Sequence, residues 1–342
     1  MNTNIDIFKN NEQMQGFYDN KTILITGGTG TFGTRATELL LDNFNCKKII
    51  IFSRDEFKQF SMKKKLKTHK NFSILRFFIG DIRDKNRIVE ACHNVDIIFH
   101  AAALKQVEAI EYNPDEAVKT NIIGTQNVIY AAKINNVDKM IALSTDKCVS
   151  PNNFYGATKM CLEKLVISSN INISPMFSIV RYGNVMSSRG SVIPLFKEQK
   201  KNGKIYITDI NMTRFTMTIE QAVLFTLNSA SLSMGGEIFV SKIPSYSILQ
   251  LKNIIAPDCE HEVIGKFPGE KLYETLISDD ETERTLDVND TYAVINVLWS
   301  NVDNRKMSIN EFYGNKIIEK EYNSDNNIKI SDEELKKLIE LY

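Results

Sequence analysis

Four side chains that can transfer protons lie in one short segment, ALSTDKCVSPNNFYGATK (residues 142–159). Asp146 and Lys147 are adjacent, and Tyr155 precedes Lys159 by four residues. Residues four apart share one face of a helix, so the Lys159 ammonium would lower the pKa of the Tyr155 phenol from about 10. The adjacent carboxyl and amino groups would suit an acid and a base, with pKa values displaced by burial and by each other. Taken alone, the same pair could equally be an exposed ion pair at a strand end.

A glycine-rich turn lies near the N-terminus, in ILITGGTGTFG. Gly27, Gly30 and Gly33 are three apart, directly after an apolar run and at the start of a helical pattern. This spacing suits a tight turn, a close approach of backbone to a pyrophosphate, and close packing of helix on strand. The sequence therefore predicts a dinucleotide site, and a positively charged nicotinamide bound there would lower the pKa of Tyr155 further.

The next apolar run ends in IFSRDEFK, where the adenosine ribose would be recognised. Ser53 and Arg54 suit the 2′-phosphate of NADP, so we expect NADP. A small change of register would instead bring Asp55 and Glu56 to the ribose hydroxyls, as in NAD sites. Further on, GDIRD places Asp81 after the third expected strand, where it could bind the adenine or cap a helix.

Apolar runs rich in β-forming residues alternate with helical patterns over the first half of the chain. Because these runs are apolar on both faces, they predict a parallel sheet covered by helices on each side. We therefore expect an α/β fold, a doubly wound parallel sheet of the Rossmann type with a smaller C-terminal substrate-binding lobe. The expected strands cover residues 21–26, 47–53, 72–80, 95–103, 139–145 and 176–185, and the expected helices cover 31–42, 114–135 and 155–169.

The second half of the chain alternates less regularly. We expect residues 18–186 to form mainly the NADP-binding domain. Residues 187–342 would form mainly the substrate-binding lobe, with some segments returning to the Rossmann sheet. Isolated elements are expected at 237–242 and 247–256, and a final helix should be capped near Ser331.

The composition argues against several classes of function. Forty-two basic and forty-two acidic side chains leave no net charge, so small molecules, and not nucleic acid or a membrane, are the expected partners. The basic stretch KKKLKTHK is then a solvated helix face. Five scattered cysteines and four dispersed histidines predict no metal site, no disulfide framework and a reducing cytoplasm, with His100 packed and not catalytic. No run of about 20 apolar residues is present, so we expect a soluble protein.

The glycine spacing and the Tyr155–Lys159 pair together resemble the short-chain dehydrogenases/reductases, in particular their extended, sugar-nucleotide-modifying branch. Within it, the order of motifs resembles the cytoplasmic inverting UDP-N-acetylglucosamine 4,6-dehydratases of pseudaminic-acid-type pathways. The resemblance runs from about residue 18 to the C-terminal tail, and the Asp146–Lys147 pair before Tyr155 is its most specific element. Membrane-bound and epimerising relatives commonly carry methionine at the Tyr155 position, so Tyr155 favours the soluble group. The motifs are TGGTGTFG, SRDE, GDIRD, AAALKQVE, STDK with YGATK, RYGNVMSSRGSV, TRF, GGEIFVSKIPS and GEKLYE.

The resemblance implies a reaction on UDP-N-acetylglucosamine. Tyr155 would take the C4 hydroxyl proton while a hydride passes from C4 to NADP, and Thr145 would hold that hydroxyl. Lys147, neutral when it acts, would remove the C5 proton that the 4-ketone acidifies. Asp146, protonated, would donate to the departing C6 hydroxyl. Return of the hydride to C6 gives a UDP-4-keto-6-deoxy-N-acetylhexosamine, and reprotonation of C5 from the other face inverts that centre.

The binding residues also follow from the resemblance, which further implies a homo-oligomer, either a dimer or a hexamer. The UDP-sugar would contact Lys105, Asn184, Val185, Arg189, Gly190, Ser191, Val192, Thr208, Arg214 and Glu270. The cofactor would contact Thr26, Gly27, Gly30, Thr31, Phe32, Gly33, Ser53, Arg54, Asp55, Lys58, Asp81, Ile82, Ala101, Ala102, Lys105, Tyr155 and Lys159.

One position departs from the family pattern. Relatives usually carry an arginine that can clamp a diphosphate where this chain has Phe267, so Lys266 or Arg214 would have to supply the charge. Two other functions stay open. One is a sugar-nucleotide 4-epimerase or reductase that uses only the Tyr155–Lys159 pair, and the other is a non-catalytic nucleotide-sensing module with the same fold.

Overall fold

A large, mostly parallel sheet forms the centre of the protein. The computed structural model describes residues 12–170, 174–186, 192–267, 269–288, 291–295, 314 and 316–341. The strand order is β13-β14-β9-β6-β5-β4-β1-β2-β3. These strands are β1 (Thr22–Thr26), β2 (Lys48–Ser53), β3 (Leu75–Ile79), β4 (Ile97–His100), β5 (Lys139–Leu143), β6 (Met176–Arg181), β9 (Ile238–Ser241), β13 (Thr285–Val288) and β14 (Thr291–Val294).

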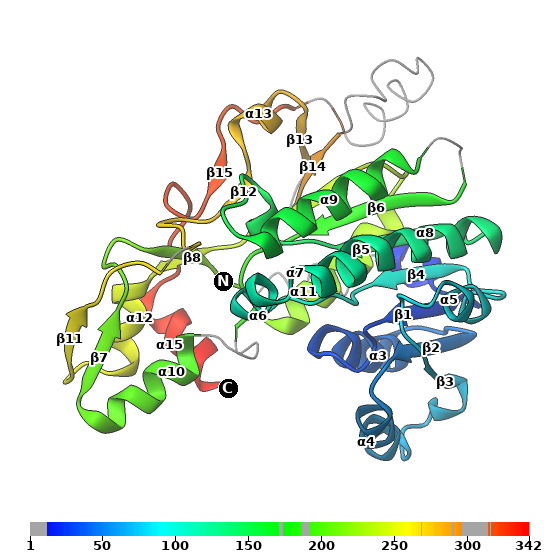
Figure 1. Cartoon of the computed structure of the whole chain (residues 1–342), viewed down its shortest axis with the longest axis horizontal. Coiled ribbons are helices and arrows are strands. Elements are labelled where there is room, and N and C mark those ends of the chain that lie inside the picture. The colour runs from blue at the N-terminus through cyan, green and yellow to red at the C-terminus, as the bar shows by residue number, and fades with distance from the viewer. Residues whose placement is uncertain are drawn as a thin grey trace.

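The first six strands and β9 run parallel, and β14 lies antiparallel between β9 and β13. Every residue of β1 and β4 is buried, because helices cover both faces of the sheet and exclude water from them. The doubly wound Rossmann fold predicted from the sequence is therefore confirmed (Figure 1).

Two layers of helices bury the two faces of the sheet. On one face, a cluster of buried apolar side chains joins the sheet to α2 (Glu12–Phe17), α3 (Thr31–Asn43), α4 (Glu56–Leu66) and α11 (Ile219–Leu232). On the other face, a second cluster involves α5 (Lys85–Ala91), α8 (Gly124–Ile134) and α9 (Phe154–Ser168).

The single helix expected over 114–135 is observed as three consecutive helical segments, which are α7 (Pro114–Ala117), the π-helical η2 (Val118–Ile123) and α8. The short helix α6 (Val107–Tyr112) precedes them.

A smaller group of elements packs around a third apolar core. It consists of α10 (Val192–Gln199), η4 (Lys200–Asn202), β7 (Lys204–Ile207), α12 (Ile248–Ile255), β11 (Glu260–Val263) and α15 (Asp332–Glu340). In Figure 1 this group lies beside the main sheet. As expected, Ser331 caps the final helix, since its side chain accepts a hydrogen bond from the Glu334 N–H.

Short elements connect this group to the sheet. These are β8 (Thr213–Phe215) paired with β10 (Ser245–Ser247), β12 (Thr275–Ile277) paired with β15 (Tyr322–Asn323), and α13 (Asp279–Thr282). Two 3-10 helices lie elsewhere: η1 (Phe72–Ile74) precedes β3, and η3 (Asp146–Cys148) follows β5. None of the helices in the ranges given above combines the length and apolar character needed to cross a membrane.

Candidate active site

The glycine-rich turn joins β1 to α3 at one end of a large cavity. Gly27 has φ of +65°, a left-handed conformation that glycine adopts without strain. A Cβ atom at Gly27 would lie 2.9 Å from the backbone nitrogen of Ala102, so only glycine lets the two backbones approach this closely. Gly30 precedes α3 as its N-cap residue with no side chain to bond the first turn. The free N–H groups at the start of α3 therefore suit a phosphate group.

The end of β2 presents an arginine to the same cavity. Arg54 has a side chain that is 52% exposed and is paired with Asp81 at 3.6 Å. The Asp55 carboxylate is already engaged, because it accepts a hydrogen bond from the Lys58 N–H at 2.9 Å and caps α4. Its pKa is lowered by that backbone bond and by the Lys58 side chain.

Asp81 does not cap a helix, so that alternative is wrong. Asp84 caps α5 by accepting from the Arg87 N–H, whereas Asp81 accepts from both the backbone and the guanidinium of Arg83. Burial opposes ionisation of Asp81, but these bonds and the charge of Arg83 hold its pKa below the ordinary value.

The adjacent acid and base lie at the end of β5. The Asp146 N–H bonds the carbonyl of Tyr182, which follows β6, so the edge of the sheet fixes this loop. The Asp146 side chain is 1% exposed, and its Oδ1 accepts from Thr145 Oγ1 at 2.9 Å and from Lys147 Nζ at 3.0 Å. Asp146 Oδ2 is buried without a hydrogen-bond partner among the described residues. The pair is thus not the exposed ion pair that the sequence also allowed.

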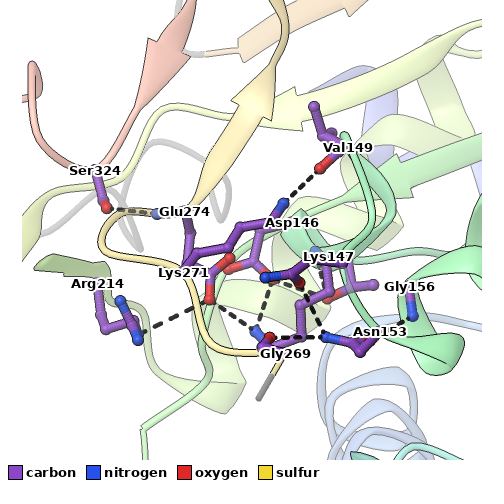
Figure 2. A network of polar contacts seen from close by, with 12 residues as sticks. Asp146, Lys147, Val149, Asn153, Gly156, Arg214, Gly269, Lys271, Glu274 and Ser324 are labelled. Carbon is purple, nitrogen blue, oxygen red and sulfur yellow. Dashed lines mark hydrogen bonds and ion pairs between the residues drawn. The ribbon is translucent and has the colours of Figure 1, made fainter. Parts of the chain in front are cut away.

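A second carboxylate lies on the other side of Lys147. Glu274, just before β12, is 4% exposed, and its Oε1 lies 3.5 Å from Lys147 Nζ. Burial alone would lower the pKa of Lys147, but the charges of Asp146 and Glu274 outweigh it and raise that pKa. Burial also raises the pKa of Asp146 against the opposing charge of Lys147, and Glu274 adds to that rise. Figure 2 shows Asp146, Lys147 and Glu274 in one polar network.

Tyr155 and Lys159 lie in the first turns of α9, as expected, but their electrostatics differ from the prediction. Burial raises the pKa of Tyr155 to about 12, although the charge of Lys147 and a hydrogen bond with Thr145 partly oppose it. Lys159 is 4% exposed and donates to the carbonyl of Leu143 at 2.8 Å. Burial lowers the pKa of Lys159 to about 8. The expected lowering of the Tyr155 pKa by Lys159 is therefore absent from this chain on its own, because burial dominates both groups.

A glycine sets the spacing between α9 and the loop after β5 that carries Asp146 and Lys147, which we call the catalytic loop for the role predicted from the sequence. A Cβ atom at Gly156 would collide with the backbone carbonyl of Lys147. The helix itself begins after Asn153, whose side chain accepts from the Gly156 N–H at 2.8 Å. This cap and the missing side chain together hold Tyr155 close to the Asp146–Lys147 pair.

A buried ion cluster connects β6, α9 and α13 next to the same loop. Arg181 at the end of β6 donates to Glu163 on α9 at 2.6 Å and to Glu281 on α13 at 2.8 Å. Cys148 bonds Glu163 Oε1 at 3.0 Å, so the catalytic loop is tied to this cluster.

Most of the predicted site residues line one cavity of about 890 Å³. Thr26 does not, because it is buried behind the turn and bonds His100 Nδ1 at 2.8 Å. Val192, Thr208 and Arg214 also lie outside the lining of this cavity. Arg189, Gly190 and Ser191 fall outside the described residues. Those in the lining are Gly27, Gly30, Thr31, Phe32, Gly33, Ser53, Arg54, Asp55, Lys58, Asp81, Ile82, Ala101, Ala102, Lys105, Thr145, Asp146, Lys147, Tyr155, Lys159, Asn184, Val185 and Glu270.

Two further placements bear on the predictions. His100 is packed as expected, since it is 1% exposed, bonds two threonine hydroxyls, and has a pKa lowered by burial to about 3. Glu274 was missed by the sequence reasoning, although it is the last residue of the GEKLYE motif. The sequence shows an acidic residue four positions after Glu270, but its spacing does not predict a contact with Lys147.

The sequence of this chain also resembles those of known proteins. Residues 23–296 match a family described as polysaccharide biosynthesis protein. Two proteins of Campylobacter jejuni, each named UDP-N-acetylglucosamine 4,6-dehydratase (inverting), are similar to this chain. One is 48% identical, covering 81% of this chain and 83% of the relative, and the other is 46% identical, covering 94% and 98%. A protein of Rickettsia bellii named UDP-glucose 4-epimerase is 41% identical, covering 93% of this chain and 95% of its own length.

A solved structure supports the same grouping. The X-ray structure of Pen from Bacillus thuringiensis is 39% identical, with a TM-score of 0.85 over 95% of this chain and 99% of that one. The family resemblance read from the motifs is therefore confirmed. This chain belongs to the polysaccharide biosynthesis protein family of extended short-chain dehydrogenases/reductases, together with the inverting UDP-N-acetylglucosamine 4,6-dehydratases.

Proposed function

We propose that this chain is an NADP-dependent UDP-N-acetylglucosamine 4,6-dehydratase, a hydro-lyase that inverts C5. One observation carries the proposal: the Asp146–Lys147 pair lines the same cavity as Tyr155 and the glycine-rich turn. Chemistry confined to C4 needs only the Tyr155–Lys159 pair. An additional acid and base suit the loss of water across C5 and C6.

The residues around the turn fit a dinucleotide. The cradle at Gly27, which a Cβ would fill, suits the pyrophosphate at the start of α3. Arg54 supports NADP over NAD, since it lines the cavity while the Asp55 carboxylate is engaged in capping α4. When bound, the cofactor would accept the hydride from C4 and return it to C6, and its positive nicotinamide would favour the phenolate of Tyr155.

The side chains then divide the proton transfers between them. Tyr155 accepts the C4 hydroxyl proton, with the Thr145 hydroxyl beside it. Lys147, as the free amine, takes the C5 proton, and the electrons of that C–H bond form the C5–C6 double bond. Asp146 gives its proton to the C6 hydroxyl, which leaves as water. At the end of this step Lys147 is an ammonium and Asp146 a carboxylate, the pair whose atoms lie 3.0 Å apart here.

The substrate would extend from the catalytic loop towards the smaller group of elements. Lys105, Asn184 and Glu270 line the cavity and would contact the UDP-sugar. Phe267, at the position of the family arginine, is 58% exposed. Either Lys266 or Arg214 would therefore supply the charge facing the diphosphate.

The test is an incubation of the purified protein with UDP-N-acetylglucosamine and catalytic NADP. The proposal expects a product lighter by one water and no net change in NADPH. A 4-epimerase, the second candidate because of the Rickettsia relative's name, would give an isomer of unchanged mass. A reductase would consume NADPH, and a nucleotide-sensing module would leave the sugar unchanged.

The remaining expectations concern the protein's setting. We propose that it works in the cytoplasm, in nucleotide-sugar biosynthesis of the pseudaminic-acid type for surface glycans or glycoproteins. The cysteines are free in the structure, in keeping with a reducing compartment. We also propose a homo-oligomer, a dimer or a hexamer, and light scattering of the purified protein measures its mass in solution.

A further inference from the structure

The backbone of Glu274, directly before β12, is bound to Ser324, directly after β15. Its backbone N–H donates to Ser324 Oγ at 3.0 Å, and its carbonyl accepts from the Ser324 N–H at 2.8 Å. Ser324 Oγ also lies 2.8 Å from Oγ1 of Thr213, the first residue of β8. Figure 2 shows Glu274 joined to Ser324 on one side and directed at the Asp146–Lys147 pair on the other. The backbone of Glu274 is thus held in place, and its buried carboxylate is part of the site and not a surface group.

The buried carboxylate of Glu274 has few contacts with other polar groups in the described part of the chain. Glu274 Oε1 lies 3.5 Å from Lys147 Nζ and 3.8 Å from Arg214 Nε. Glu274 Oε2 is buried with no hydrogen-bond partner within the described part of the chain. A buried carboxylate held only by charge is costly to desolvate, so the positive groups around it must offset that cost.

Two carboxyl groups, those of Asp146 and Glu274, therefore lie close to the single amine of Lys147. Two neighbouring buried carboxylates disfavour each other's ionisation, so a proton is retained more readily by one of them. Burial opposes ionisation of Glu274, but Lys147, Arg214 and Lys271 outweigh it and keep the pKa of Glu274 below its ordinary value. The pKa of Asp146 is raised by burial and by the charge of Glu274. Of the two carboxyl groups, Asp146 therefore retains a proton more readily than Glu274.

We propose that Glu274 is a positioning residue that serves as the fixed counter-ion of Lys147 and leaves Asp146 protonated for its role as the acid. This inference rests on the dehydratase function proposed above. When Lys147 takes the C5 proton it becomes an ammonium, and the Glu274 carboxylate stabilises the positive charge where it forms. Asp146 meanwhile gives its proton to the departing hydroxyl. Its negative charge is not needed to balance Lys147 before this transfer.

The competing explanation is that Glu274 only anchors Arg214 and the loop before β12. The loop has other anchors, since Lys271 Nζ donates to the Val149 carbonyl at 2.6 Å and Arg214 donates to the Leu272 carbonyl at 3.1 Å. An anchoring role predicts loss of stability and of overall rate when Glu274 is changed. It predicts no change in the pH at which the acid and the base titrate.

The experiment compares the pH dependence of kcat/KM for dehydration in the wild type, Glu274→Gln and Glu274→Asp. Activity needs protonated Asp146 and neutral Lys147, and the charge of Glu274 raises the pKa of both groups. Removing that charge should move both limbs of the profile to lower pH, by about one pH unit or more for a charge this close. The other groups facing Lys147 stay in place in every variant: Lys105, Tyr155, Arg214, Tyr246 and Lys271.

A matched control removes the carboxylate of the residue before β15, the strand that pairs with β12. Glu321 precedes β15 and bonds the Asn323 side chain, so Glu321→Gln changes the net charge equally without touching Lys147. We expect the Glu321→Gln profile to match the wild type. In Glu274→Gln, cofactor reduction should proceed while water loss slows about 10-fold or more, because the Lys147 ammonium loses its stabilisation and Asp146 retains its proton less readily.

The outcomes separate this inference from the proposed function. The counter-ion role is overturned if the pH profile of Glu274→Gln has the same two limbs as the wild type. It is also overturned if the profile of Glu321→Gln shifts as far as that of Glu274→Gln. If Glu274→Gln proves unfolded by circular dichroism, Glu274→Asp decides. Its carboxylate is drawn back from Lys147, so a smaller shift in the same direction supports the role and an unchanged profile overturns it. A wild-type protein that releases no water contradicts the dehydratase function itself, and this inference fails with it.

Discussion

Asp146 and Lys147 are neighbours in sequence, and the short η3 turn lets their side chains meet at 3.0 Å. Their proximity couples the two groups electrostatically, so the proton positions in the pair are linked. In the proposed reaction Lys147 accepts one proton and Asp146 donates another, so the coupling between the two groups affects both transfers. Each can therefore be tested by the step at which its loss halts the reaction.

Replacing Lys147 by alanine should stop the reaction after hydride transfer. Tyr155 and Lys159 stay intact, so the C4 hydroxyl is still oxidised, but nothing removes the C5 proton. Reduced cofactor should accumulate beside a 4-keto sugar that keeps its 6-hydroxyl, visible by absorbance and mass spectrometry. Dehydration at the wild-type rate by Lys147→Ala would make the pair structural.

Asp146→Asn should halt the reaction later. Lys147 can still exchange the C5 proton with solvent, whereas cleavage of the C6–O bond lacks its acid. In deuterium oxide this variant should place deuterium at C5 of the 4-keto sugar while water loss slows by about 100-fold or more. Unimpaired water loss would remove the acid role from Asp146.

Arg54→Ala tests the choice of cofactor at the residue scale. The guanidinium would contact only the 2′-phosphate, so its loss should weaken NADP binding by about 10-fold or more and NAD binding much less. Isothermal titration with each cofactor measures both affinities. Lys63→Ala, in the last turn of the following helix α4, serves as a control. Equal losses for NADP and NAD in Arg54→Ala would remove the basis for NADP.

At the scale of elements, the contact between α9 and η3 sets the geometry of the catalytic groups. Gly156→Ala should push the Lys147 carbonyl away, which costs about 1–3 kcal/mol of unfolding free energy and lowers the dehydration rate at least about 10-fold. The neighbouring Ala157→Gly costs only helix propensity, about 1 kcal/mol, and should leave the rate nearly unchanged. Thermal unfolding and initial rates measure both effects, and a fully active Gly156→Ala would show that this contact does not position the loop.

The buried cluster of Arg181, Glu163 and Glu281 joins α9, β6 and α13, and its contribution should depend on pH. Burial opposes ionisation of Glu281, but Arg181 holds its pKa below the ordinary value. A lowered pKa stabilises the fold above the ordinary glutamate pKa of about 4.3, and that contribution disappears as the pH falls through the folded value.

Glu281→Gln should therefore cost about 3 kcal/mol at neutral pH, and the difference from the wild type should shrink below about pH 4. Denaturant unfolding at several pH values measures this. The exposed pair of Glu333 and Lys337 provides a control, since Glu333→Gln should leave the free energy of unfolding almost unchanged. A Glu281→Gln difference that is independent of pH would contradict the ionic origin.

The sequence predicted elements well where apolar periodicity was strong. The buried strands β1 and β2 begin and end within a residue of the expected ranges. The fourth apolar run continues past the end of β4, because its last alanines leave the sheet and line the cavity. Likewise, the expected helix over 114–135 is divided by the π-helical η2, which hydrophobic periodicity does not reveal.

At the scale of the whole molecule, the second half of the chain completes both the sheet and the site. Strands β9, β13 and β14 extend the sheet beyond β6, and Glu274 reaches the catalytic loop from between them and the smaller group of elements. The motifs near the first strands could be placed from their own spacing. Glu274 could not, because its approach to Lys147 depends on the pairing of β12 with β15, which joins segments far apart in the sequence.

The central claim is that one cavity oxidises C4, eliminates water across C5 and C6, and returns the same hydride to C6. UDP-N-acetylglucosamine carrying deuterium at C4 tests this most directly, with the product analysed by mass spectrometry and NMR. The account predicts a product lighter by one water with the deuterium in its C6 methyl group. Deuterium recovered at C4 of an isomer of unchanged mass would contradict it and would indicate a 4-epimerase instead.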